Sequence, residues 1–224
     1  MRIDKYLGNL WIVPRRKIKK LLKTWEVLLN NTQVDSPQIK IKEWDILSIY
    51  EDEIEVKFDI YILLHKVAGY VSSNVDEWEY LSYKELLMDC PYGELVEIAG
   101  RLDTDTEGLL FCSSDGKMIH NIIHPHKKVE KEYYVRADKF ISDKDIRLLE
   151  RGVTITWWHE TAPAKITRIG KKEIQLTITE WKFHQVKLML EAIWNSVKYL
   201  RRDRIGPREL WDLPKGKWKY IDIN

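Results

Sequence analysis

Apolar and polar positions change their spacing along the chain, and the change predicts two regions. In the first region, Ile18, Leu21 and Leu22 recur at i, i+3 and i+4, which is the spacing of an amphipathic helix. Pro14 suits the first turn of that helix, because its missing N–H would have no partner there. Short β-like runs follow, at residues 27–29, 39–41 and 46–49. The pattern predicts a small α/β module over residues 1–55.

From residue 60 to residue 224, strand-like and helix-like segments alternate without a regular βαβ repeat, which is an α+β pattern. The expected strands are residues 61–64, 108–112, 133–137, 164–168 and 174–179. The expected helices are residues 83–88, 117–124, 143–151 and 184–193. Residues 51–60 carry mixed charge and no apolar core pattern, so we place the linker between the two domains there.

Charge is concentrated in one short segment. The chain has 37 Lys and Arg against 35 Asp and Glu, a net charge of +2, so a contact with nucleic acid must come from a local cluster. Such a cluster covers the polar face of the N-terminal helix: Arg15, Arg16, Lys17, Lys19, Lys20 and Lys23. A solvated helix face is the plain alternative. Beside small strands, the cluster favours binding of RNA phosphates.

Composition restricts the class of protein. Hydrophobic residues make up 44% of the 224 residues, which is ordinary for a globular protein. No apolar run approaches the roughly 20 residues that cross a bilayer, and residues 1–5 lack the apolar core of a signal peptide. Cys90 and Cys112 have no metal-ligand spacing and are interpreted as reduced thiols. We expect a cytoplasmic protein with no membrane partner.

The most informative stretch is residues 100–110, GRLDTDTEGLL, which sets a carboxylate between two glycines. Glycine permits a tight backbone and close approach of a ligand. By themselves, Asp103 and Asp105 fit a turn better than a metal pair, because the longer acidic ladder of an EF-hand is absent. A loose cluster of histidines, which no cysteine joins, favours an RNA-facing or capping role over metal binding: His120, His124 and His126.

The GRLD sequence followed by T-x-G-L-L resembles the central motif of ribosomal RNA pseudouridine synthases, in the branch with an N-terminal S4 RNA-binding domain. The resemblance covers nearly the whole chain. Further motifs in the family's order are residues 66–71, 131–133, 184–187, 204–206 and 212–214. The resemblance implies an S4-like α/β module over residues 1–55 and a catalytic domain over residues 60–224. The catalytic domain would have a mixed, largely antiparallel sheet.

The resemblance also implies roles for individual side chains. Asp103 would attack a flipped uridine, at C1′ of the ribose or at the base. Tyr133 would stack on the base and help to remove the C5 proton, although a tyrosine in a strand is otherwise an ordinary core residue. Lys187 would keep Asp103 ionised and oriented. Leu200 would pack under the uracil, and Arg101 would contact an RNA phosphate or position the loop.

No metal or organic cofactor is implied. The implied partner is ribosomal RNA, with the protein acting as a monomer. Many relatives have arginine where this chain has Lys187, and lysine looks typical of the branch that acts on 16S small-subunit RNA. Three alternatives stay open: a pseudouridine synthase for 23S RNA, a non-catalytic ribosome-assembly factor, and a glycoside hydrolase. The hydrolase would need a second acid near Asp103, for which Asp105 is nominally available.

Tryptophan is unusually frequent, with 10 residues, as many as glycine. Six tryptophans occupy turn-like contexts in which relatives usually have glycine: Trp11, Trp25, Trp44, Trp181, Trp194 and Trp211. Replacing them by glycine would restore the usual glycine share of about 7%. One hypothesis is that the gene uses UGA as a glycine codon that was translated as tryptophan. The alternative is genuine tryptophans, some of which stack on RNA; Trp181 would then crowd the loop that leads to Lys187.

Overall fold

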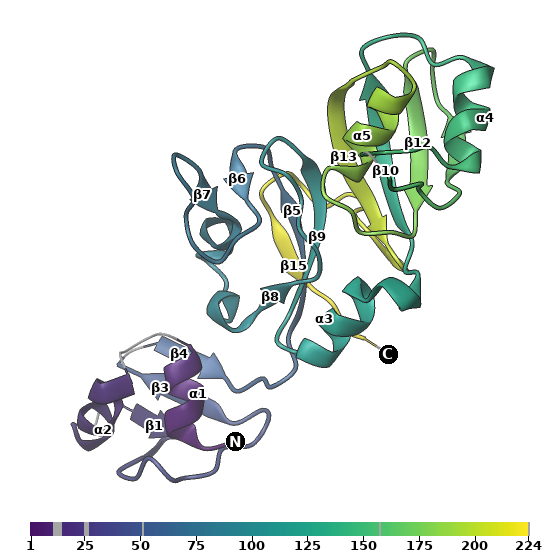
Figure 1. Cartoon of the computed structure of the whole chain (residues 1–224). Helices are drawn as coiled ribbons and strands as arrows, with labels where there is room; N and C mark the ends of the chain where they lie inside the picture. The colour runs from purple at the N-terminus through teal and green to yellow at the C-terminus, as the bar shows by residue number, and fades with distance from the viewer. Residues whose placement is uncertain (11–14, 25–26, 51, 157, 224) are drawn as a thin grey trace. The chain divides into compact units, whose positions relative to one another are not determined.

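The computed structural model describes residues 1–10, 15–24, 27–50, 52–156 and 158–223, without the side chains of residues 15 and 16. The chain divides into two compact units (Figure 1). Residues 1–60 and 88–96 form the first unit, and residues 61–87 and 97–224 form the second. Residues 88–96, which the sequence assigned to the catalytic domain, therefore cluster with the N-terminal region.

The first unit combines two helices with an antiparallel sheet of strand order β2-β1-β3-β4. Its elements are α1 (Ile3–Asn9), α2 (Arg15–Lys23), β1 (Val27–Leu29), β2 (Thr32–Gln33), β3 (Ile46–Ile49), β4 (Asp52–Glu55) and the 3-10 helix η2 (Gly93–Leu95). The predicted basic helix is confirmed as α2. Its apolar stripe, Ile18, Leu21 and Leu22, is at most 4% exposed. On its charged face, the described lysines are exposed: Lys17, Lys19, Lys20 and Lys23.

Two expectations for the first unit are wrong. Residues 39–41 form no strand. Lys40 makes a single β-bridge with Arg2, and the pairing cannot continue because α1 begins at the next residue, Ile3. Residues 51–60 are not a plain linker, because β4 lies within them and Val56 and Ile60 are buried. Mixed charge hid this edge strand, since an edge strand tolerates charged side chains.

The second unit is built on one mixed sheet. Among the described residues, nine strands form it, in the order β11-β12-β10-β13-β9-β5-β15 with β14 on β13 and β8 on β9. Within this sheet, as far as the structure describes it, only β13 and β9 pair in parallel. The strands are β5 (Tyr61–Lys66), β8 (Glu97–Ile98), β9 (Glu107–Ser113), β10 (Lys131–Ala137), β11 (Lys165–Arg168), β12 (Glu173–Ile178), β13 (Val197–Ile205), β14 (Arg208–Glu209) and β15 (Trp218–Tyr220). The expected mixed, largely antiparallel α+β architecture is confirmed.

Helices and short elements border this sheet. They are α3 (Gly116–Ile123), α4 (Asp143–Arg151), α5 (Gln185–Ala192), the 3-10 helices η1 (Tyr83–Leu87) and η3 (Pro125–Lys127), and the strand pair β6 (Tyr70–Val71) and β7 (Leu81–Ser82). Figure 1 shows α4 and α5 beside β10, β12 and β13. The expected helix at residues 83–88 is a 3-10 helix, because a single turn of five residues cannot sustain an α-helical ladder.

Strand β13 was not predicted, although it is the longest strand and joins the two halves of the sheet. Its sequence, VKYLRRDRI, hides the alternation because four of its nine residues are Arg or Lys and one is Asp. Leu200, Arg202 and Ile205 are nonetheless buried. Nowhere in the described chain is a helix both long enough and apolar enough to cross a bilayer.

Candidate active site

The turn that carries Asp103 is shaped by two glycines. Gly100 has φ +88° and Gly108 has φ +115°, conformations that side-chain-bearing residues rarely adopt. A Cβ atom on Gly108 would run into the backbone of Arg202 in β13, so only glycine permits the close parallel pairing of β9 with β13. The turn that carries Asp103 therefore lies directly before the point where β9 pairs with β13.

Lys66, at the end of β5, holds the backbone of this turn. Its Nζ atom donates to the carbonyl oxygens of Val67, Asp103, Thr104 and Thr106, at 2.9–3.4 Å. The side chain is fully buried, and burial lowers the pKa of Lys66 to about 8, although nearby carboxylates, Asp105 first, oppose the change. The ammonium group of Lys66 thus holds the backbone of the turn at Asp103 by binding its carbonyl oxygens.

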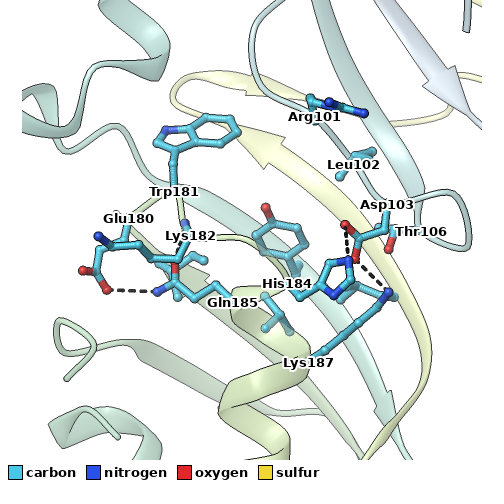
Figure 2. Close-up of a pocket in the computed structure, with 14 residues that line it drawn as sticks. Arg101, Leu102, Asp103, Thr106, Glu180, Trp181, Lys182, His184, Gln185 and Lys187 are labelled. Atoms are coloured by element: carbon cyan, nitrogen blue, oxygen red, sulfur yellow. Dashed lines mark hydrogen bonds and ion pairs between the residues drawn. The ribbon is translucent and has the colours of Figure 1, made fainter. Parts of the chain in front are cut away.

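Two nitrogen-bearing side chains face the Asp103 carboxylate (Figure 2). Lys187 Nζ lies 2.7 Å from Oδ2, and His184 Nε2 lies 3.4 Å from Oδ1. His184 precedes α5 and has a left-handed backbone, φ 52°, while Lys187 lies in the first turn of α5. One helix start therefore supplies both groups that face the carboxylate.

Lys187 is shared between two acids. Its Nζ atom also lies 2.7 Å from Oδ1 of Asp105. Burial alone would lower the pKa of Lys187, but hydrogen bonds and attraction from Asp103 and Asp105 outweigh it and raise that pKa. Burial likewise raises the pKa of Asp105, yet the bond to Lys187 leaves it below its ordinary value. The cation keeps its charge, which favours an ionised carboxylate beside it.

A small cavity of about 70 Å³ opens in front of Asp103. Tyr133 from β10 and Leu200 from β13, 7% and 6% exposed, line it together with Lys187. Arg101 lines its rim; that side chain is mostly exposed and lies 3.4 Å from Glu77. The five residues that the resemblance singled out in the catalytic domain thus share one cavity.

The segment between β12 and α5 forms the opposite wall. Glu180 accepts hydrogen bonds from the backbone of Ala162 at 2.8 Å and from Gln185 at 2.9 Å. Lys131 donates to the carbonyls of Thr179 and Glu180, and its Nζ lies 4.2 Å from the centre of the Trp181 ring. Burial, followed by repulsion from Arg202, lowers the pKa of Lys131 to about 7. These bonds fix the wall that carries His184.

Two residues that contact the turn or its carboxylates, Lys66 and His184, had no role predicted from the sequence, and Asp105 was predicted only as a turn residue or a nominal second acid. Their motifs were recognised, but the contacts are not local in sequence. The predicted RNA-binding residues belong to the first unit. There Lys19, Lys20 and Lys23 are exposed, and the side chains of Arg15 and Arg16 lie outside the described part. A cavity of about 340 Å³ in that unit is lined by Arg2, Asp4, Lys5, Ile18 and Lys19.

The histidine cluster is close-packed but is not arranged as a metal site. The rings of His120 and His124 are 4.8 Å apart, and those of His124 and His126 are 5.3 Å apart. Among the described residues, no three His, Cys, Asp or Glu side chains are placed to hold a metal ion. His124 instead accepts from the backbone of His126, a capping contact at the start of η3.

Known proteins match both the sequence and the structure. The family described as RNA pseudouridylate synthase matches residues 60–192. A ribosomal small subunit pseudouridine synthase A from Vibrio vulnificus is 36% identical over 99% of this chain and 96% of its own. An uncharacterized RNA pseudouridine synthase from Aquifex aeolicus is 31% identical, covering 99% and 92%. A crystal structure of a pseudouridylate synthase, 28% identical, aligns with a TM-score of 0.69 over 99% and 96%. The chain therefore belongs to the RNA pseudouridylate synthases, the isomerases that turn uridine into pseudouridine.

Proposed function

We propose that this chain converts one uridine of 16S ribosomal RNA into pseudouridine, with Asp103 as the catalytic carboxylate. The observation that carries the proposal is the ion pair between Asp103 and Lys187, 2.7 Å long, in a cavity that Tyr133 and Leu200 also line. An ionised carboxylate can attack and later leave, which suits a covalent isomerisation.

The reaction conserves every atom of the nucleoside. The bond from N1 to C1′ breaks and a bond from C5 to C1′ forms, while C5 loses a proton and N1 gains one. No oxidant, reductant or second substrate enters this balance. Tyr133 flanks the base and assists removal of the C5 proton, and Leu200 supports the uracil ring. The uridine leaves its stack to reach Asp103 at the mouth of the cavity.

The choice of ribosomal RNA rests on relatives and on charge. Relatives from Vibrio species are named for the small ribosomal subunit. In the first unit, the exposed lysines of α2 offer contacts to RNA phosphates: Lys19, Lys20 and Lys23. Together they favour a folded RNA substrate over a free nucleoside.

Carbodiimide mapping of pseudouridine in ribosomal RNA tests the proposal. A strain without the gene should lack one pseudouridine in 16S RNA, and the wild-type gene should restore it. Asp103→Asn should not restore it, whereas Asp143→Asn should, because that acid is 80% exposed on α4 and lines neither cavity beside Asp103.

Each other outcome has a distinct meaning. A missing site in 23S RNA would move the substrate to the large subunit. Restoration by Asp103→Asn would remove Asp103 from catalysis. An unchanged modification map would favour the ribosome-assembly factor.

A further inference from the structure

A second and larger cleft adjoins the cavity at Asp103. Its volume is about 390 Å³. It shares part of its lining with the first cavity: Arg101, Leu102, Asp103, Trp181, Lys182 and His184. Phe183 lines only the larger cleft, and Val71, Ser72 and Glu77 form its other wall. The isomerisation of one uridine does not require this cleft, because the reacting atoms of the uridine lie beside Asp103 in the first cavity.

Phe183 presents an aromatic ring in this cleft. The side chain is 81% exposed, although burial of a phenylalanine side chain is normally favourable by about 1.5–3 kcal/mol. Its ring stacks on His184, with centroids 3.7 Å apart and planes 19° apart. The histidine that faces Asp103 thus supports one side of the ring, which leaves aromatic surface exposed.

We propose that this cleft binds the base of a nucleotide next to the target uridine, stacked on Phe183. The inference rests on the proposed function. Extruding a uridine removes a stacking neighbour from the adjacent base, and an aromatic side chain restores such a contact. Arg101, exposed in the same cleft, provides a guanidinium group for the connecting phosphate. Because every base has a π-face, Phe183 selects an unpaired neighbour and not a particular base.

The test uses a short RNA stem-loop that carries the mapped uridine. Phe183→Ala should weaken RNA binding by about 5- to 150-fold, the equivalent of one base–aromatic stack, and should change the single-turnover rate at saturating RNA by a much smaller factor. Phe183→Tyr should restore binding. Phe140→Ala is the matched control, because Phe140 is 58% exposed and lines neither cavity.

An abasic nucleotide beside the uridine sharpens the test. One of the two flanking abasic RNAs should bind wild type as weakly as normal RNA binds Phe183→Ala, and the two changes together should add nothing further. Equal binding by Phe183→Ala and Phe140→Ala would overturn the inference. So would a lower saturating rate with unchanged affinity, which would make Phe183 a support for His184. If wild type forms no pseudouridine, the proposed function itself fails.

An independent observation concerns the tryptophans. Four of them have left-handed backbone: Trp44 (φ 72°), Trp78 (φ 57°), Trp194 (φ 59°) and Trp211 (φ 49°). Glycine adopts this region freely, whereas a bulky side chain is strained there. Their side chains are 64–102% exposed, so no burial offsets the strain. Trp11 and Trp25 lie outside the described residues.

We infer that positions 44, 78, 194 and 211 are glycine in the protein made by its native host, through UGA read as glycine. Position 181 belongs with them on other grounds. Trp181 lines a cavity of only about 70 Å³, where ligand sites usually offer roughly 300 Å³ or more. Its buried Nε1 donates no hydrogen bond within the described residues. Glycine at 181 would enlarge the cavity and leave Phe183 in place.

Peptide mass spectrometry of the protein from its native host decides this inference. Glycine is expected at the four left-handed positions and at 181. Trp218, which pairs with Leu64 and contacts Tyr220, is the internal control and should be tryptophan. Tryptophan at positions 44, 78, 194 and 211 would overturn the inference. In the recombinant chain, glycine at these four positions should raise the melting temperature by a few degrees per site, whereas Trp218→Gly should lower it.

Discussion

Lys66 and Lys187 contact the same short turn, residues 103–106, but bind different groups. Lys66 is fully buried and, among the described residues, donates only to main-chain carbonyls, and its pKa falls to about 8. Lys187 is 21% exposed and binds two carboxylates at 2.7 Å, and its pKa rises. Carbonyl dipoles can orient an ammonium group, but their attraction does not offset the cost of removing its charge from water. The full negative charges of two carboxylates can offset that cost. One lysine therefore shapes the backbone, and the other sets the charge at Asp103.

The largest effect is expected from removing the charge. Lys187→Met leaves Asp103 and Asp105 without their shared cation, and we expect the rate at saturating RNA to fall about 10²- to 10³-fold, as for loss of one electrostatic catalytic group. Lys187→Arg should retain much of the rate, since a cation remains. Single-turnover assays measure both. A near-normal rate in Lys187→Met would show that Asp103 does not need the charge of Lys187 and that His184 suffices as its partner.

Removing the backbone anchor should act on stability. Lys66→Met leaves buried carbonyls without their donor, and we expect the free energy of unfolding to fall by about 2–4 kcal/mol, with reduced activity. Lys117→Met, at an exposed lysine on α3, is the control. Chemical denaturation measures the difference. If stability and activity stay unchanged, the glycines and Ser72, which bonds the backbone of Leu102, suffice to hold the turn.

The two pKa shifts predict opposite responses to pH. Between about pH 8 and 10.5, unfolded chains keep the Lys66 proton that the folded protein has lost, so stability rises with pH. We expect a gain of about 2 kcal/mol from this group between pH 8 and 10. Lys187 has the opposite shift, so its contribution is complete below its unfolded pKa and is lost above it.

The difference between wild type and Lys66→Met isolates the effect of Lys66. Lys131, with a pKa of about 7, contributes equally to both proteins and cancels. Parallel stability profiles for the two proteins would show that Lys66 titrates normally.

Lys19, an exposed lysine, can be compared with Lys66 and Lys187. Lys19 lies on the surface of the first unit, so Lys19→Glu should leave the fold intact. Loss of one phosphate contact should weaken RNA binding about tenfold and reduce the salt slope of binding by about 1. Titrations at several salt concentrations measure both. Unchanged salt-dependent affinity would remove α2 from the RNA-docking surface.

Local sequence was sufficient for the elements that carry a clean period. Helix α2 follows from its apolar spacing, and β9, β10 and α5 were predicted to within a few residues. The turn at Asp103 followed from its flanking glycines. Strand β13 could not be predicted in this way, because its buried Arg202 looks like a surface residue in the sequence.

The sequence by itself determined the family, the acidic turn and the residues that a resemblance could name, since these are written in short contiguous motifs. Only the tertiary structure decided that Lys66 holds the turn from beneath, that His184 faces Asp103, and that Phe183 stands exposed in a cleft. The contacts that Lys66 and His184 make with Asp103 join residues 37 and 81 positions apart. The pairing of β5, β9 and β13 brings such distant segments together, and no local pattern records that pairing.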